Sequence, residues 1–351
     1  MKFYEMELAK AAKVLVEDVF QLKEGETFII TADTESDERV VKAVAAAAFA
    51  VGAKPMAIWL ASPLGVGKAA DPMLPINALT EVLKQADAWV EFNNKWLLYS
   101  TPFIKATQNN EKLRYLCLVG MDVDMLVRLI GRVDTELLEK FMVKVTDLTK
   151  NAKRMKIKTP AGTDVEFENY PDMLIGCNIG KANVPGIHFL SGQIGWAPTW
   201  ETINGTIVFD GSIDPPCRLL TEPVTLTIEK GVVKDIKGGR QAAEFKKWLE
   251  SFNDPNMFRL AHVCYGFNPK AKLTGNIVED ERVWGCTEWG LGYYSDTKTS
   301  SGKMRNGIPA PSHTDGICLN SSIWLDDVQL LDNGRIVYEE ELKDLEAKLL
   351  R

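Results

Sequence analysis

The chain contains three histidines, and one of them precedes an aspartate by two positions. This pair, His313 and Asp315, lies in the segment PAPSHTDG. Alternate side chains of an extended strand point to the same face, so the imidazole and the carboxylate would lie side by side. His262 stands earlier, in AHVCYG, just before a bend that contains glycine and proline. Two imidazoles and one carboxylate leave positions open on a metal, as in non-haem Fe(II) oxygenases, so these three residues are candidate Fe(II) ligands.

Other interpretations of the same residues stay open. Pairs of the type H-x-D occur by chance, and a buried histidine more often bonds a backbone carbonyl than a metal. An imidazole beside a carboxylate can also act as a base without a metal. The six cysteines form no C-x-x-C pair, which favours neither a disulfide framework nor a zinc knuckle.

The third histidine, His188 in GIHFLSG, is a candidate proton acceptor for a substrate hydroxyl, because imidazole titrates near neutral pH. A half-buried loop position without a catalytic role would explain it equally well. Ser295, in GYYSD, could donate a hydrogen bond to a substrate, although a loop serine is usually only solvated. No serine stands in a G-x-S-x-G motif and no cysteine is directly adjacent to a histidine, so covalent catalysis has no signature.

Aromatic residues gather between Trp196 and Trp200 and between Trp284 and Tyr294. Because neither group follows helical spacing, we expect them in loops, where they could line an apolar slot for a flat ring. Packing in the core would explain these tryptophans equally well.

Alternating strands and helices are predicted for the first half of the chain. The expected elements are strands at 26–31, 55–60, 88–92 and 115–119 and helices at 37–51, 77–85 and up to 110. This pattern predicts an α/β domain over residues 1–150, with a Rossmann-like parallel sheet covered by helices. The first strand leads into no G-x-G-x-x-G motif, so a dinucleotide fingerprint is missing.

Strands dominate the second half. Two alternating runs around the turn PAGT predict a hairpin. The expected elements are strands at 153–159, 164–168, 205–209, 224–229 and 232–236 and helices at 242–252 and 339–350. Residues 151–351 are therefore predicted to form a β-rich α+β domain that binds the metal, and its last helix is expected on the surface or in an oligomer contact.

Charge and hydropathy restrict the partners. The formal net charge is −7, and acidic and basic residues are mixed along the chain, so no basic face favours nucleic acid or an anionic membrane. The first twenty residues follow helical spacing rather than the pattern of an export signal, and the longest apolar stretch, 40–51, is too short to span a bilayer. We expect a cytoplasmic protein that binds neither nucleic acid nor membranes.

Several short motifs resemble a known superfamily. They are LSG at 190–192, NGTIVFD at 204–210, LTIEKG at 226–231, FNDP at 252–255, GFNP at 266–269 and SHTD at 312–315. Together they are similar to two related groups, the aminopeptidase T or leucyl aminopeptidase family of two-metal peptidases and the 2,5-dihydroxypyridine 5,6-dioxygenases. The resemblance covers residues 150–330 clearly and the first half only in its general layout.

Three positions distinguish the two groups. The peptidases carry a glutamate at the position of Gln193, another at the position of His262, and a histidine at the position of Glu288. Losing two carboxylates removes negative charge that would hold two divalent cations close together. The dioxygenase pattern therefore fits better, although the segment 281–292 and the tryptophans near Trp196 depart from it.

The dioxygenase resemblance implies a role for each candidate residue. Fe(II) would be bound by His262, His313 and Asp315, while His188 would accept a substrate proton and Ser295 would orient the substrate. The resemblance also implies a homo-oligomer that inserts both atoms of O2 into a hydroxylated N-heteroaromatic ring. The expected ring is 2,5-dihydroxypyridine, cleaved between carbons 5 and 6 to N-formylmaleamate. The alternatives are a metal-dependent aminopeptidase and a non-catalytic metal-binding or assembly protein.

Overall fold

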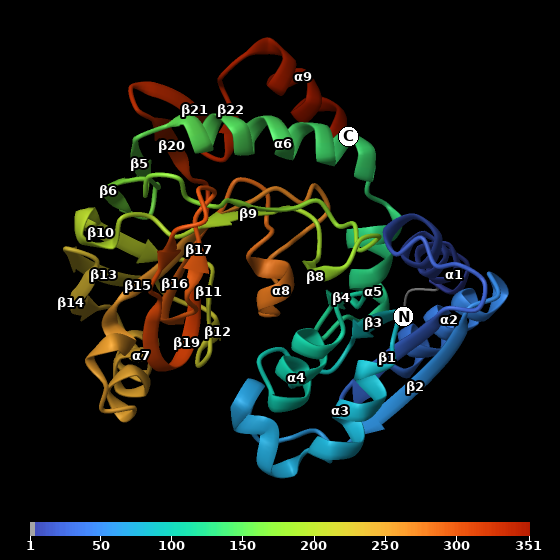
Figure 1. Ribbon diagram of the computed structural model, residues 1–351. Coiled ribbons are helices and arrows are strands. Elements are labelled where there is room, and N and C mark those ends of the chain that lie inside the picture. The colour runs from blue at the N-terminus through green and yellow to red at the C-terminus, as the bar shows by residue number, and fades with distance from the viewer. Residues whose placement is uncertain (1–3) are drawn as a thin grey trace. The chain divides into compact units, whose positions relative to one another are not determined.

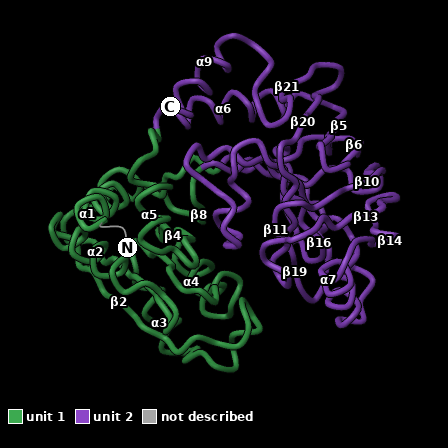
Figure 2. The backbone as a smooth tube through the Cα atoms, turned by 180° about the vertical axis from the view of Figure 1, so that it is seen from behind, with its two compact units in different colours: residues 1–135, 178–191 green, residues 136–177, 192–351 purple. Residues whose placement is uncertain are grey.

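The computed structural model describes residues 4–351 and has a mixed α/β fold with one parallel sheet and several antiparallel sheets. The chain divides into two compact units, coloured separately in Figure 2. Unit 1 consists of residues 4–135 and 178–191, and unit 2 consists of residues 136–177 and 192–351. The chain therefore leaves unit 1, returns to it briefly and leaves it again.

Unit 1 is built on sheet A, whose five strands are all parallel. In spatial order these strands are β2 (Lys54–Leu60), β1 (Thr27–Asp33), β3 (Ala88–Glu91), β4 (Arg114–Cys117) and β8 (Gly186–Phe189). The central strands are buried along almost their whole length, as expected for a parallel sheet with both faces covered. Trp89 and Tyr115 pack against each other in this core, with ring centroids 4.5 Å apart.

Helices connect the strands of unit 1. They are α1 (Glu5–Val14), α2 (Glu38–Ala50), α3 (Ile76–Lys84), α4 (Thr101–Asn109) and α5 (Val123–Leu126), with π-helical turns at Leu15–Val19 and Val127–Gly131 and a 3-10 turn at Gly67–Met73. Asp37 caps α2 by accepting a hydrogen bond from the N–H of Arg39, and Ser100 caps α4 in the same way. None of the helices among residues 4–351 has the length and apolar content needed to cross a membrane.

Unit 2 contains two large sheets. Sheet B has the spatial order β14 (Val232–Lys237), β13 (Val224–Glu229), β10 (Asn204–Phe209), β6 (Asp164–Glu168), β5 (Arg154–Lys158), β20 (Ser322–Leu325), β21 (Val328–Asp332) and β22 (Arg335–Ile336). Sheet C has the order β12 (Arg218–Leu219), β11 (Ser212–Asp214), β19 (Ile308–Cys318), β16 (Thr287–Tyr294), β15 (Leu260–Gly266), β9 (Gln193–Trp196) and β7 (Gly176–Asn178).

Sheets B and C pack against each other through one face of sheet C. Trp289 on β16 meets Phe167 on β6 edge to face, with ring centroids 5.5 Å apart. A Cβ at Gly316 of β19 would collide with the ring of Phe209 on β10, so this glycine allows the two sheets to approach. Because side chains alternate along a strand, the residues next to Trp289 and Gly316 point to the opposite face of sheet C. We call this opposite face the site face.

Helices accompany the two large sheets of unit 2 (Figure 1). They are α6 (Thr135–Asn151), α7 (Arg240–Ser251), α8 (Ile277–Asp280) and α9 (Glu340–Leu349), with 3-10 turns at Trp200–Thr202 and Pro255–Phe258 and a two-stranded ribbon of β17 (Thr297–Lys298) and β18 (Met304–Arg305). The last helix runs beside α6, where Lys144 and Glu341 form an ion pair at 2.6 Å (Figure 1).

The predicted strands and helices occur within a few residues of their expected bounds, and β5 and β6 form the predicted hairpin. The two compact units differ from the predicted ranges 1–150 and 151–351, since α6 belongs to unit 2 and β8 belongs to unit 1. Two independent domains with a boundary at residue 150 stay a prediction. The placement of the tryptophans in loops was wrong for Trp196, which ends β9, and for Trp289, which lies inside β16, whereas Trp284 lies in a turn.

Candidate metal centre

The three candidate ligands meet on the site face of sheet C. His313 and Asp315 are two residues apart on β19, and Nε2 of His313 lies 2.9 Å from Oδ1 of Asp315. His262, on β15, places its Nε2 3.4 Å from the same oxygen. The three ligand atoms all lie within 4.8 Å of one another, and the two imidazole rings stack with centroids 5.1 Å apart. One divalent ion could contact all three side chains.

A glycine on the intervening strand makes this meeting possible. His262 is paired with Gly290 of β16, and Gly290 is paired with Asp315 of β19, so the three residues form one row across the sheet. Strands β15 and β19 are therefore two spacings, about 10 Å, apart. A Cβ at Gly290 would lie 2.8 Å from Nε2 of His262 and closer still to two other ring atoms. The ring of His262 lies across the backbone of Gly290 to reach Asp315.

The backbone fixes the tautomer of His313. Its Nδ1 lies 2.8 Å from the carbonyl oxygen of Tyr293, on the neighbouring strand β16. A carbonyl can only accept a hydrogen bond, so Nδ1 donates here, and Nε2, which faces Oδ1 of Asp315, is the nitrogen that a metal would take in place of a proton. Histidines that bind metals usually donate their second ring N–H in this way.

A fourth buried group, Glu288, adjoins the three candidate ligands. It lies on the site face of β16, its side chain has no exposed surface, and its Oε1 is 2.7 Å from Nε2 of His262. Among residues 4–351 this oxygen has no partner with the geometry of a hydrogen bond, although His262 lies close to it. A buried carboxylate oxygen without a hydrogen bond needs an explanation, and a cation bound beside His262 would supply one.

The electrostatics of the cluster favour positive charge. Burial alone would lower the pKa of His262, but the carboxylates of Glu288 and Asp315 outweigh burial and raise it to about 9. Burial would likewise raise the pKa of Glu288, and the charge on His262 outweighs this effect and lowers it. For Asp315, burial dominates and raises the pKa even though His313 opposes it. In each case burial disfavours the charged form of the group and a neighbouring opposite charge favours it, and the larger of the two effects sets the direction of the pKa shift.

Behind Glu288, three side chains form a hydrogen-bonded network. Gln193, the first residue of β9, donates through Nε2 to Oε2 of Glu281 at 2.8 Å and to Oε2 of Glu288 at 3.3 Å. Its Oε1 accepts from Nη2 of Arg282 at 3.4 Å. Arg282 also forms an ion pair with Glu281 and donates to the carbonyl of Val278 at 2.6 Å.

The two remaining predicted site residues lie elsewhere in the chain. His188 is on β8, the edge strand of sheet A, and belongs to unit 1, whereas the three candidate ligands belong to unit 2. Its Nε2 lies 2.8 Å from the carbonyl oxygen of Val184, so this nitrogen donates and Nδ1 keeps its lone pair. Ser295 is exposed and follows β16, two residues after Tyr293, whose carbonyl holds His313.

The donor set fits a metal of the non-haem iron type. Two imidazole nitrogens and one carboxylate oxygen are the donors such an ion prefers, and the carboxylate of Glu288 supplies further negative charge.

No motif in the sequence indicates a function for Gly290 or Arg282. The glycines in the aromatic segment EWGLGYY were the available signal for Gly290, because a glycine inside a strand often marks a close approach.

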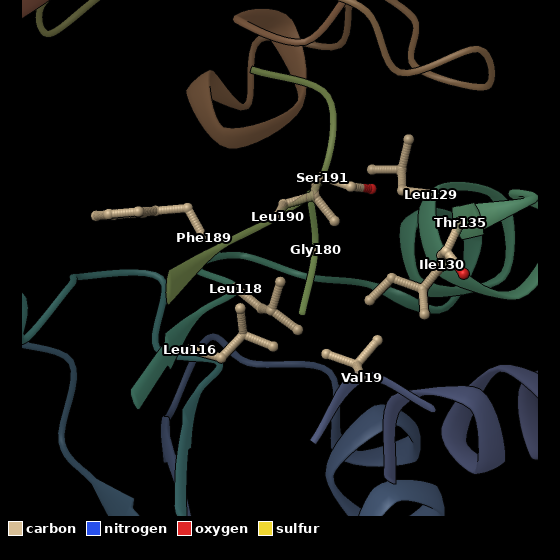
Figure 3. A pocket seen from close by; sticks show the side chains of 10 residues that line it. All are labelled: Val19, Leu116, Leu118, Leu129, Ile130, Thr135, Gly180, Phe189, Leu190 and Ser191. Carbon is tan, nitrogen blue, oxygen red and sulfur yellow. The ribbon is translucent and has the colours of Figure 1, made fainter. Parts of the chain in front are cut away.

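A small cavity in unit 1, drawn in Figure 3, is not a substrate site. It measures about 10 Å³, which is the space of a single water molecule. Its lining is largely aliphatic and includes Leu116, Leu129 and Leu190. A pyridine ring cannot fit there.

The chain is similar to known proteins in sequence and in fold. Residues 13–338 match the family described as NicX, 2,5-dihydroxypyridine 5,6-dioxygenase. The chain is 30% identical over 206 residues to the 2,5-dihydroxypyridine 5,6-dioxygenase of Pseudomonas putida strain KT2440, a match that covers 55% of this chain and 57% of that relative. The match thus spans a little over half of the relative's length.

Two solved structures have the same fold. The structure of 2,5-dihydroxypyridine dioxygenase from Pseudomonas putida KT2440 has a TM-score of 0.76 at 22% identity and covers 97% of this chain and 100% of its own. Wild-type AmpT from Thermus thermophilus has a TM-score of 0.70 at 15% identity and covers 96% of this chain and 100% of its own. Because the family match extends over residues 13–338, the chain belongs to the 2,5-dihydroxypyridine 5,6-dioxygenase family.

Proposed function

We propose that this protein is an Fe(II)-dependent dioxygenase that opens a hydroxylated N-heteroaromatic ring. The observation that carries the proposal is the cluster of His262, His313 and Asp315, whose ligand atoms lie within 4.8 Å of one another on one face of sheet C. Membership of the 2,5-dihydroxypyridine 5,6-dioxygenase family supports the same reaction class. When bound, Fe(II) supplies a redox-active Lewis acid with coordination positions left open to small molecules.

The protein residues would hold the metal ligands and move one proton. The carbonyl of Tyr293 holds Nδ1 of His313 and so directs Nε2 toward Asp315 and the metal position, and Gly290 gives the ring of His262 room beside Asp315. His188 donates through Nε2 to the carbonyl of Val184, which leaves Nδ1 free to accept the proton of a substrate hydroxyl. Ser295 is exposed and could donate a hydrogen bond that orients the ring.

The proposed substrate is 2,5-dihydroxypyridine or a close analogue. Cleavage between carbons 5 and 6 would give N-formylmaleamate, which contains both oxygen atoms of O2, so the reaction needs no external reductant. The relative from Pseudomonas putida bears the name of this reaction, and the match to it covers 57% of its length. We also propose, from the sequence, that the protein works in the cytoplasm as a homo-oligomer.

Oxygen consumption tests this function directly. The protein is reconstituted with Fe(II) without air, and oxygen uptake is then measured with a panel of hydroxylated pyridines and benzenes. We expect uptake that requires both Fe(II) and a ring carrying hydroxyl groups, with one O2 consumed per ring. Absence of uptake with every ring, in protein that carries iron, would sink the proposal.

The aminopeptidase alternative is weaker. The AmpT structure shares the fold, but Gln193 and His262 offer no carboxylate at two positions where the peptidases are expected to have one. A peptidase would release leucine from a chromogenic leucine amide in the presence of Co(II) or Zn(II), without O2. The same reconstituted protein can be tested for this activity.

A further inference from the structure

The chain between β16 and β19 carries an arginine that docks onto two aromatic rings. We call this segment, residues 295–307, the ribbon, because its strands β17 and β18 pair with each other. Arg305 ends β18, and its guanidinium carbon lies 4.1 Å from the ring centroid of Tyr170 and 3.9 Å from that of Trp200. Aromatic faces attract a cation at such distances. The rings therefore hold the second strand of the ribbon through Arg305.

Hydrogen bonds strengthen the attachment of the ribbon. Arg305 donates from Nη1 to the carbonyl oxygen of Ala197 at 2.7 Å and from Nη2 to that of Pro198 at 2.5 Å. At the tip of the ribbon, the backbone N–H and the hydroxyl of Ser300 donate to the carbonyl oxygen of Asp172 at 2.8 and 3.2 Å. The planar fork of an arginine reaches two acceptors at once, which a lysine does not reproduce.

Trp200 connects Arg305 to the surroundings of a candidate metal ligand. It is buried, and its indole N–H donates at 2.8 Å to the carbonyl oxygen of Ala261, the residue before His262. Its ring meets the ring of Tyr294 edge to face, with centroids 6.1 Å apart. The ring of Tyr294 in turn lies beside the imidazole of His262, with centroids 6.2 Å apart. A path of contacts thus leads from the ribbon to the candidate metal centre.

Tyr294 is placed where a flat substrate would meet it. It ends β16, it is half-buried, and its contact with His262 puts its ring on the site face. A ring that coordinates a metal ion held by His262 must lie close to that imidazole. Aromatic rings attract each other at centroid separations of about 4.5–7 Å, so the substrate ring would come within range of Tyr294.

We infer that Tyr294 is the side chain against which the substrate ring packs and that Arg305 positions it through Trp200. Tyr294 determines specificity, because it favours a flat ring over other ligands of the same metal ion. Arg305 is a positioning residue, since its guanidinium holds Trp200, and Trp200 supports the ring of Tyr294. This inference rests on the proposed metal site and on the proposed ring substrate.

The test compares a flat ligand with a ligand that has no ring. The protein is loaded with Co(II) without air, and affinities for 2,5-dihydroxypyridine and for azide are measured from the visible absorption of the metal ion. We expect Tyr294→Leu to bind the pyridine about tenfold more weakly and azide as tightly as the wild type does. Tyr294→Phe keeps the ring and should bind both ligands like the wild type. Unchanged pyridine affinity in Tyr294→Leu, or equal losses for both ligands, would overturn the inference.

Arg305 is tested with the same two ligands. We expect Arg305→Gln to weaken pyridine binding about fivefold without changing azide binding, and Arg305→Lys to recover part of the loss, because an ammonium is still attracted by the rings. Lys303→Gln removes a cation from an exposed position of the ribbon and is the matched control, with both affinities unchanged. Unchanged pyridine affinity in folded Arg305→Gln would overturn the positioning role.

Proteolysis checks the attachment of the ribbon without any metal or substrate. A protease that cleaves after lysine should cut the ribbon at Lys298 and Lys303 faster in Arg305→Gln than in the wild type. Equal cleavage rates would show that Arg305 does not hold the ribbon.

The outcomes separate this inference from the proposed function. Pyridine binding that depends on Tyr294, in protein that takes up no oxygen after reconstitution with Fe(II), would support the inference and contradict the dioxygenase. Oxygen uptake that Tyr294→Leu leaves unchanged at limiting pyridine concentration would do the reverse. A Co(II)-loaded wild type that binds azide but no hydroxylated ring would overturn the inference, and one that binds no Co(II) would remove the proposed metal site as well.

Discussion

Glu91 in unit 1 and Glu288 in unit 2 are both buried without exposed surface, and their surroundings differ. Glu91 ends β3 and accepts hydrogen bonds from the hydroxyl of Tyr115 at 2.5 Å and from the backbone N–H of Leu97. Both of its oxygens are thus satisfied by neutral donors. Glu288 leaves one oxygen without a hydrogen bond beside His262, which carries charge when it is protonated.

The pKa shifts of the two carboxyls follow from these surroundings. Burial raises the pKa of Glu91 to about 7, although its hydrogen bonds oppose the change. For Glu288 the effect of burial is outweighed by His262, and the pKa is lowered. Burial and a perturbed pKa are therefore not sufficient to identify a functional carboxylate. What distinguishes Glu288 is an unsatisfied oxygen close to groups that can bind a metal.

The largest expected effect comes from making the same chemical change in both regions. Asp315→Asn removes a proposed metal ligand, whereas Glu91→Gln converts a carboxyl that the metal centre does not use. Since loss of a partner outside the ligand set commonly costs 10 to 100-fold in metal affinity, loss of a ligand should cost about a hundredfold or more. We expect Asp315→Asn to lose bound metal and oxygen uptake and Glu91→Gln to retain both, as measured by elemental analysis and an oxygen electrode. Equal metal content in the two variants would contradict the ligand assignment.

A second effect is expected at His188. His188→Gln can keep the hydrogen bond to the carbonyl of Val184 but has no group that accepts a proton near neutral pH. General acid–base groups typically contribute about 10² to 10⁴-fold in rate. We expect metal content to stay unchanged while oxygen uptake falls by a factor in this range. An unchanged rate would remove His188 from the proton path.

A third prediction concerns the pH dependence of stability. The pKa of Glu91 in the folded protein, about 7, lies above its usual value of 4.5, so the folded state binds more protons than the unfolded state between these values. Stability contributed by protonated Glu91 is therefore present at low pH and is lost as pH rises through 7. Between pH 5 and pH 8 the wild type should lose about 2–3 kcal/mol relative to Glu91→Gln. Urea unfolding of both proteins measures this, and parallel pH profiles would show that the expected shift is absent.

The smallest expected effect comes from one methyl group on the site face. Gly290→Ala places a Cβ against the ring of His262 and should displace it, lowering metal affinity about tenfold. Gly176→Ala, on β7 of the same sheet, is the matched control because its Cβ would meet the nearest atom at an ordinary 3.5 Å. Calorimetric titration with Co(II) compares the two variants. Equal affinities would mean that the ring of His262 can move without cost.

Local patterns in the sequence were sufficient for much of the fold. The βαβ unit of β1, α2 and β2 was predicted within two residues, because β-branched runs, an alanine-rich helix and an aspartate cap specify these elements locally. The strand β16 was not predicted, because its two glycines are residues that strands usually lack and they weaken the local sequence signal for a strand. Gly290 is required there by the ring of His262, which comes from another strand.

The candidate site was predicted only in part for a similar reason. The pair His313 and Asp315 follows from alternation within one strand, but its meeting with His262 depends on the register of three strands. The network of Gln193, Glu281 and Arg282 joins residues far apart in the chain, and no local spacing indicates it. Such contacts are set by tertiary packing rather than by local propensity.

The return of the chain to unit 1 affects how the protein can be divided into fragments. Strand β8 completes sheet A beside β4, yet it follows the first two strands of sheet B in the sequence. A fragment that stops at residue 150 would lack β8 and would leave the edge of β4 unpaired, a condition that favours aggregation through strand addition. A fragment intended to preserve sheet A must therefore supply residues 178–191 as well, for example through a linker in place of the intervening hairpin.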